Sequence, residues 1–294
     1  MTTFKLFRGD THDWQMHLQA ASTLSIKFGR EHVKEASSSL THKVAMEFFT
    51  GVITWYDSLS CGSTGLKPFT KLDRFDEEVS PQIRFDKLMG CENWVMRLIW
   101  EIATFAEWKT RLEAGGRVSM WEIVRRGSDI KRQLETGLVT SSGYPSGTAS
   151  VDAMTARSED ASKSRVRETT RVFANAACVY LKVNIFGPHP DLPEIRQGVS
   201  KTMAALDTLR DKGLVRNLLW PVYIAGCMAT AEYESYWRNL LSGVSQEQWS
   251  FGRPRNVLNI MEECWLLRKC EPGTVVAVDW MRAMRNLDVG VLLV

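Results

Sequence analysis

The sequence lacks closely spaced cysteines. It contains six cysteines in 294 residues, and no two of them form a Cys-x-x-Cys pair. A compact zinc cluster needs thiolate ligands at short spacing, so this distribution predicts no metal site of that kind. Scattered cysteines are typical of a reducing compartment, where most of them behave as small buried hydrophobic residues. The six are Cys61, Cys91, Cys178, Cys227, Cys264 and Cys270.

A strong charge excess is also missing. The 37 Lys and Arg residues against 34 Asp and Glu residues leave a formal net charge of +3, which is dispersed along the chain. Proteins that read DNA concentrate positive charge on one face. We therefore expect no specific DNA binding by this chain.

Long hydrophobic runs are absent as well. The uncharged segment from Asn217 to Ala231 is shorter than the roughly 20 residues that a membrane-spanning helix needs, so no membrane association is expected. Lys5, Arg8 and Asp10 interrupt the start of the chain, where a secretory signal would need an apolar stretch. These features predict a cytoplasmic or nuclear protein that is not secreted.

Alternation of apolar and polar residues is almost absent, with Thr274–Val278 as the one candidate strand. Apolar residues instead recur every three or four positions, which predicts helices. The expected fold is all-α, a single domain over 1–294 with nine to eleven helices and a flexible Ser/Thr/Gly-rich loop at 139–164. No Gly-x-Gly-x-x-Gly or phosphate-loop motif is present, so no cofactor is expected.

Helix ends are predicted from capping residues. Ser119-x-x-Glu122 and Asp191-x-x-Glu194 have the pattern of capping boxes, and Asp279 is expected to cap a short final helix. Gly137 and Gly213 are expected to end helices. Other helices are expected over about 10–28, 40–59, 92–113, 158–186, 236–241 and 254–268, with residues 60–88 as a long loop containing at most one helical turn.

Eleven tryptophans and twelve methionines are present. Such side chains line apolar ligand cavities, and they also fill cores, so both interpretations stay open. Pro221 suits the first turn of a buried helix that begins at Trp220, with Ile224 and Cys227 facing the core. The candidate binding pocket for a hydrophobic small molecule comprises Trp100, Trp220, Tyr223, Met228 and Trp265.

Only one pair of residues suggests acid–base chemistry. Asp13 and His17 are four residues apart, so they would lie on one face of a helix, where a carboxylate can orient an imidazole. The alternative is a capping Asp13 beside a partly buried His17. No metal site is expected.

Several short segments are similar to one known family. Leu218–Cys227 resembles a signature near the end of the fungal-specific transcription factor domain, the regulatory region downstream of the binuclear zinc cluster in fungal activators. Other segments resemble that family in the same order along the chain. They are Gly9–Leu18, Met89–Cys91, Ala177–Leu181, Asp279–Met281 and Val291–Val294. Members usually carry a zinc cluster and further helices before the first of these segments, and we expect this chain to lack them.

The resemblance implies a regulatory domain that responds to a ligand or binds a partner. A stand-alone domain of this kind would bind a hydrophobic small molecule, form a homodimer or bind another regulator, in connection with fungal specialised metabolism. Alternatively, the same fold would serve as a biosynthetic enzyme, a cyclase or pericyclase that acts on an apolar metabolite by shape and orientation. Whether the chain is an enzyme stays open at this point.

Overall fold

The computed structural model describes residues 14–32, 40–65, 68–69, 83–116, 119–142, 153–243, 254–270 and 279–289. Within these ranges the regular structure consists of eleven α-helices and two 3-10 helices, without a strand. The all-α prediction is therefore confirmed. The elements are α2 (Trp14–His32), α3 (Leu40–Thr64), α4 (Phe85–Leu88), α5 (Asn93–Ala114), α6 (Met120–Ser142), α7 (Ala153–Phe186), α8 (Pro193–Asp207), η2 (Lys212–Asn217), α9 (Leu219–Cys227), η3 (Ala231–Tyr233), α10 (Glu234–Ser242), α11 (Pro254–Cys270) and α12 (Trp280–Leu287).

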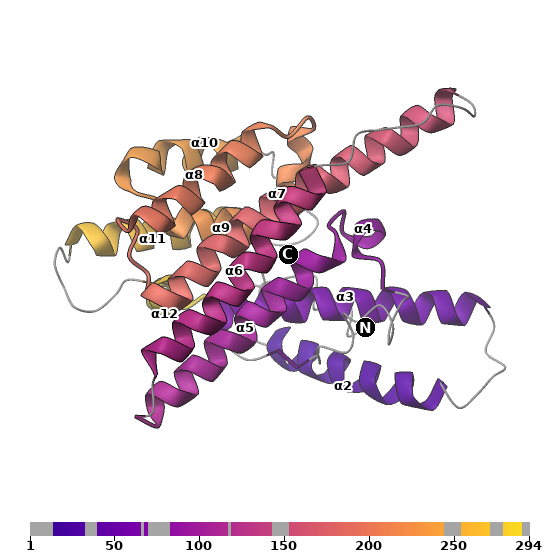
Figure 1. Ribbon diagram of the computed structural model, residues 1–294, viewed down its shortest axis with the longest axis horizontal. Helices are drawn as coiled ribbons and strands as arrows, with labels where there is room; N and C mark the ends of the chain where they lie inside the picture. Colours follow the sequence, from indigo (N-terminus) through magenta and orange to yellow (C-terminus); the bar gives the residue numbers. More distant parts are fainter. Residues whose placement is uncertain are drawn as a thin grey trace.

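The longest helix, α7, organises the molecule. It contacts α5, α6, α8 and α9, and its first turns project beyond the body of the protein (Figure 1). Helices α2 to α4 lie on one side of the layer formed by α5, α6 and α7, and α8 to α11 lie on the other (Figure 1). Contacts of α3 with α5 and of α12 with α3 connect the two sides, so the helices form a single domain.

The core is one contiguous set of buried side chains with aromatic rings at its centre. The ring of Phe173 lies 5.2 Å from Trp55 and 6.1 Å from Trp220, and Tyr180 lies 5.8 Å from Trp220. Pairs of aromatic rings at these separations stabilise a core beyond the area that they bury. Helices α3 and α9, which are far apart in the sequence, therefore meet at α7.

Helix α6 corrects the expected position of the loop. It continues past Gly137 to Ser142, and α7 already begins at Ala153, so the two ends of the predicted loop at 139–164 are helical. Gly137 does not end the helix because it packs against an aromatic ring, where an added Cβ would lie 2.5 Å from Trp94. The hydroxyl of Thr140 donates to the carbonyl of Thr136, which satisfies both groups within the helix. Residues 143–152 lie outside the described ranges.

The second predicted capping box is also wrong. The N-cap of α8 is Leu192, which has no side-chain oxygen, and Pro193 begins the helix with a backbone that is already restricted to helical geometry. Helix α8 ends at Asp207 rather than at Gly213, and Gly213 lies in η2, where its N–H donates to Asp211. The other two caps are confirmed, because Ser119 accepts from the N–H of Glu122 and Asp279 accepts from that of Arg282.

The predicted loop over 60–88 is shorter than expected. Helix α3 continues through Thr64, and α4 supplies the one short turn that was expected. The candidate strand Thr274–Val278 and the start of the first predicted helix lie outside the described residues.

Candidate functional site

Helix α9 is buried along its whole length. Every residue from Leu219 to Cys227 is buried, which confirms the predicted buried helix. The segment has no charged side chain, so burial on all sides leaves no ion without a partner. Gly226 allows close packing, because an added Cβ would collide with the thioether of Met261 on α11.

Trp220 occupies the centre of this region with 1% of its surface exposed. Its ring stacks on Phe173 at an interplanar angle of 15° and meets the edge of Tyr180. An added Cβ on Gly62 would lie 2.6 Å from the indole nitrogen of Trp220. That nitrogen is buried and has no hydrogen-bond acceptor among the described residues.

Side chains from α11 donate hydrogen bonds to the backbone carbonyls at the end of α9 and just after it. The indole N–H of Trp265 donates to the carbonyl of Gly226 at 3.0 Å. The guanidinium of Arg268 donates to the carbonyls of Cys227 and Ala229. The last carbonyls of a helix have no partner within it, so Trp265 and Arg268 together act as a cap supplied by another helix.

The five predicted pocket residues are only partly brought together. Trp220, Tyr223 and Met228 are buried on or directly after α9, and Trp265 contacts the same helix from α11. The hydroxyl of Tyr223 donates to the sulfur of Met284, and burial raises the pKa of this phenol well above its usual range. Trp100 lies on α5 and is half-buried at the edge of the core. Ligand binding by these residues stays a prediction.

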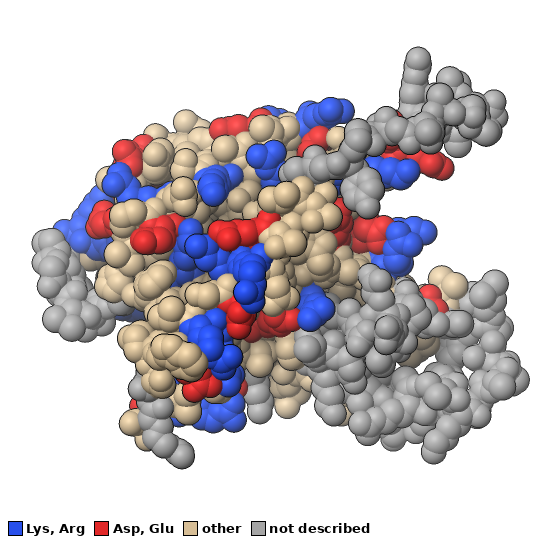
Figure 2. All heavy atoms as spheres, viewed as in Figure 1, with Lys and Arg blue, Asp and Glu red and all other residues tan. Residues whose placement is uncertain are grey.

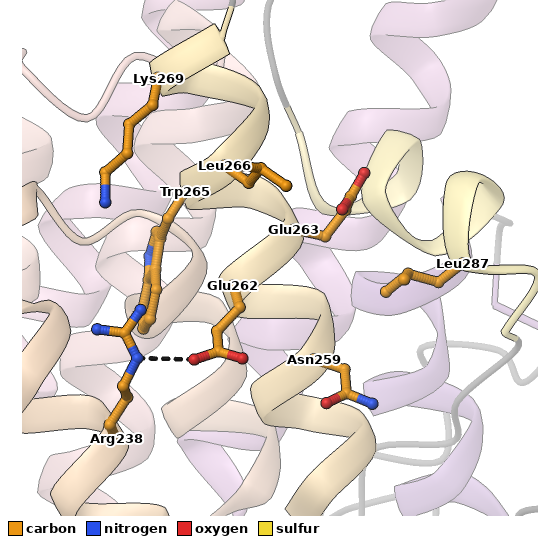
Figure 3. A pocket seen from close by; sticks show the side chains of 8 residues that line it. All are labelled: Arg238, Asn259, Glu262, Glu263, Trp265, Leu266, Lys269 and Leu287. Carbon is orange, nitrogen blue, oxygen red and sulfur yellow. Dashed lines mark hydrogen bonds and ion pairs between the residues drawn. The ribbon is translucent and has the colours of Figure 1, made fainter.

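A surface groove of about 400 Å³ lies beside Trp265, between α10, α11 and α12. Figure 3 shows Arg238 from α10 reaching the ring of Trp265, with Leu287 from α12 on the opposite side of α11. Arg238 lies 5.0 Å from the centroid of the Trp265 ring, a cation–π contact. The groove is lined by Arg238, Asn259, Glu262, Glu263, Trp265, Leu266, Lys269 and Leu287.

Ion pairs hold the α10 side of this groove. Arg238 donates to Glu262 at 2.7 Å, and this hydrogen bond raises the pKa of the guanidinium. Glu234 is 7% exposed and accepts from Lys269 at 2.9 Å, with Arg238 at 3.4 Å. Of this group, sequence reasoning found only Trp265. A signal for other members of the group was present in the sequence, because Asn259, Glu262 and Leu266 are three and four residues apart and so lie on one face of a helix.

The predicted acid–base pair is not tested by the structure. His17 is half-buried on α2, and Asp13 lies outside the described residues. Among the residues that the structure describes, no group of three or more His, Cys, Asp or Glu side chains is placed to hold a metal ion. None of the described helices combines the length and the apolar character that spanning a membrane requires.

Comparison with known proteins gives relatives of one kind. The chain is 27% identical over 285 residues to the trichothecene biosynthesis transcription regulator TRI10 of Trichoderma arundinaceum, with 87% of this chain and 63% of the relative covered. It is 28% identical over 294 residues to the transcription factor dibT of Pestalotiopsis microspora, covering 86% and 46%. The ustiloxin B cluster transcription factor ustR of Aspergillus flavus is 26% identical over 272 residues, covering 88% and 45%.

This chain therefore spans between about half and two thirds of the length of these relatives. No solved structure matches it. The family model described as the fungal specific transcription factor domain matches residues 1–294, which confirms the resemblance seen in the short motifs. The chain belongs to the fungal specific transcription factor domain family.

Proposed function

We propose that this chain acts in the nucleus as the regulatory domain of a transcription regulator for a fungal secondary-metabolite gene cluster. Support comes from its relatives, which include regulators of trichothecene biosynthesis and of the ustiloxin B cluster. The family match covers the whole chain. Specific DNA contact by this chain itself is not expected, because its charge of +3 is small and, on the face seen in Figure 2, both signs are interspersed.

The α10–α12 groove is the proposed binding site for a protein partner. The observation that carries this proposal is the exposure of Leu266 and Leu287, with the paired charges of Arg238 and Glu262 on the other side of α11 from Leu287. Exposed apolar side chains with a polar rim are typical of protein interfaces. An amphipathic helix from the partner would place its apolar face on the two leucines and its polar flanks beside the charged residues.

A reporter for transcription of the gene cluster in the fungal host tests this site. Leu266→Asp places a charge in the groove and should weaken partner binding about tenfold, or ~1.4 kcal/mol, and transcription should fall with it. Val139→Asp is the matched control, because Val139 is also exposed but lies on α6. Equal transcription by the two variants and the wild type, at equal protein levels, would contradict the groove as the partner site.

A hydrophobic small molecule at the aromatic core is the second candidate. Its specific support is that the indole N–H groups of Trp220 and Trp237 are buried without an acceptor among the described residues. Buried donors of this kind usually have a partner, and a ligand carbonyl or hydroxyl would supply one if α9 moved. The enzymatic alternative, a cyclase acting on an apolar metabolite, stays a prediction without a specific supporting observation.

Native mass spectrometry of freshly purified protein separates the two candidates. A bound metabolite would appear as a discrete added mass, and it would quench tryptophan fluorescence when added back to the stripped protein. Trp121→Phe serves as the control because Trp121 is exposed on α6, so the response should persist in that variant. An unchanged mass together with no fluorescence response to fungal extracts would leave the partner proposal as the better one.

A further inference from the structure

The first two turns of α6 carry an apolar surface with a cation at its edge. Met120, Trp121 and Val124 expose 66%, 72% and 46% of their surface, and Arg125 is exposed beside them. Successive residues of an α-helix are rotated by about 100°, so these four side chains lie within an arc of about 140° on one side of the helix. We call these four residues the α6 surface.

The other side of α6 is covered. Ile123, Ile130 and Leu134 are buried, and α6 packs mainly on α5 and α7 (Figure 1). The three buried positions are separated by seven and four residues, which places them along one stripe. The packing of the helix is therefore complete without Met120, Trp121 and Val124, so these side chains are available to another molecule.

Trp121 differs from the other tryptophans of this protein. Among the tryptophans whose side chains the structure describes, Trp121 is exposed and the others are buried or half-buried. The guanidinium of Arg125 lies 5.5 Å from the centroid of its ring, a cation–π contact between positions four residues apart. Tryptophan and arginine are enriched among the residues that contribute most to binding at protein interfaces. The pair therefore has the composition of an interface anchor.

The charge of Arg125 is not balanced within its own helix. The other three cations of α6 each pair with a carboxylate three or four residues away. These pairs are Arg126–Glu122, Lys131–Glu135 and Arg132–Asp129. Arg125 has no ion pair with any residue that the structure describes. A carboxylate brought by another molecule would therefore meet a cation that has no competing partner in α6.

We propose that the α6 surface binds a protein segment that combines acidic and apolar side chains. The apolar side chains would pack on Met120, Trp121 and Val124, and a carboxylate would pair with Arg125. The surface also includes the first turn of α6, where the helix dipole favours negative charge. A nucleic acid would need several unpaired cations in a row, whereas Lys131 and Arg132 further along α6 are paired.

Fluorescence anisotropy with the purified chain tests the proposal. The probe is a labelled amphipathic peptide of glutamate and leucine, compared with a twin that has lysine for glutamate and a twin that has alanine for leucine. The glutamate–leucine peptide should bind at least about tenfold more tightly than either twin. Arg125→Glu should reverse the preference between glutamate and lysine. The matched control is Arg171→Glu, which makes the same change of charge at an exposed position of α7 and should keep the preference.

A second pair of variants tests the apolar contact. Trp121→Ala should weaken binding of the glutamate–leucine peptide at least about tenfold, whereas Val139→Ala, at a position of α6 that is 73% exposed, should leave it unchanged. Circular dichroism of each variant checks that the helices persist.

Leu266→Asp separates this proposal from the α10–α12 groove, because that variant should bind the peptide as the wild type does. Three results would overturn the proposal for the α6 surface. They are no binding of the glutamate–leucine peptide, equal binding of the glutamate and lysine peptides by the wild type, or binding that Leu266→Asp weakens and Trp121→Ala does not.

Discussion

Two uncharged segments of this chain have opposite environments. The residues of α9 and the first half of α2 both lack Asp, Glu, Lys and Arg, yet α9 is buried on all sides whereas α2 exposes Met16 and Leu24. Helix α9 is contacted by α7, α8, α10 and α11, and α2 packs mainly on α3. The absence of charge permits burial, but the number of neighbouring helices decides whether burial occurs.

The largest expected effect tests the burial of α9. Trp220→Ala removes a side chain that stacks on Phe173, and it should lower the free energy of unfolding by about 3–5 kcal/mol through the cavity that it leaves. Trp121→Ala is the control, because Trp121 is 72% exposed and its loss should cost under about 0.5 kcal/mol. Urea denaturation measures both. Similar losses would mean that the two tryptophans are equally packed.

The second prediction compares two leucines on α2. Leu18 is 1% exposed and Leu24 is 52% exposed, so Leu18→Ala should cost about 2–4 kcal/mol and Leu24→Ala under about 1 kcal/mol. Thermal denaturation at several protein concentrations measures the difference. If the loss for Leu24→Ala grows with protein concentration, the side chain is buried between copies rather than within one.

The third prediction tests how closely α3 approaches α9. Gly62→Ala should cost about 1–3 kcal/mol, because the added methyl would lie 2.6 Å from the indole nitrogen of Trp220. The same change in a Trp220→Phe background should cost less, since phenylalanine lacks that nitrogen. Denaturation of all four proteins gives the coupling between the two positions. Additive effects would show that Gly62 and Trp220 do not touch.

The fourth prediction concerns the cap on α9. Arg268→Met keeps the apolar stem but leaves the carbonyls of Cys227 and Ala229 without their donor, so we expect a loss of about 1–2 kcal/mol. Arg285→Met, at an exposed position of α12, should change stability by less than about 0.5 kcal/mol. Urea denaturation distinguishes them, and equal values would contradict a capping role for Arg268.

Helix positions were largely predictable, whereas some of their ends were not. The predicted helices at 92–113 and 254–268 differ from α5 and α11 by at most two residues at either end, because apolar periodicity and Pro254 define them locally. Gly137 was misinterpreted as a stop because glycine at a helix end and glycine beneath an aromatic ring look the same in a sequence. Asp191 was misinterpreted because Pro193 alone suffices to begin α8.

The candidate site was less predictable than the fold. Trp265 was identified as a candidate because it is aromatic. Its contact with Arg238 joins α11 to α10, and the apolar periodicity within each helix does not predict how two helices pack together. Likewise, Glu262 pairs with a cation 24 residues away in sequence. Spacing within one helix gives only the faces of that helix, so contacts between helices require the packing to be known.

The amino-acid sequence by itself determined the all-α fold and the cap at Asp279, because each depends on residues close together in the chain, and it determined the family through short motifs in a fixed order along the chain. Only the tertiary structure decided which uncharged helix is covered. It also decided that Arg238, Trp265 and Leu287 border one groove. The physical reason is that burial depends on which helices pack together, and that packing is set by the whole core rather than by the local pattern.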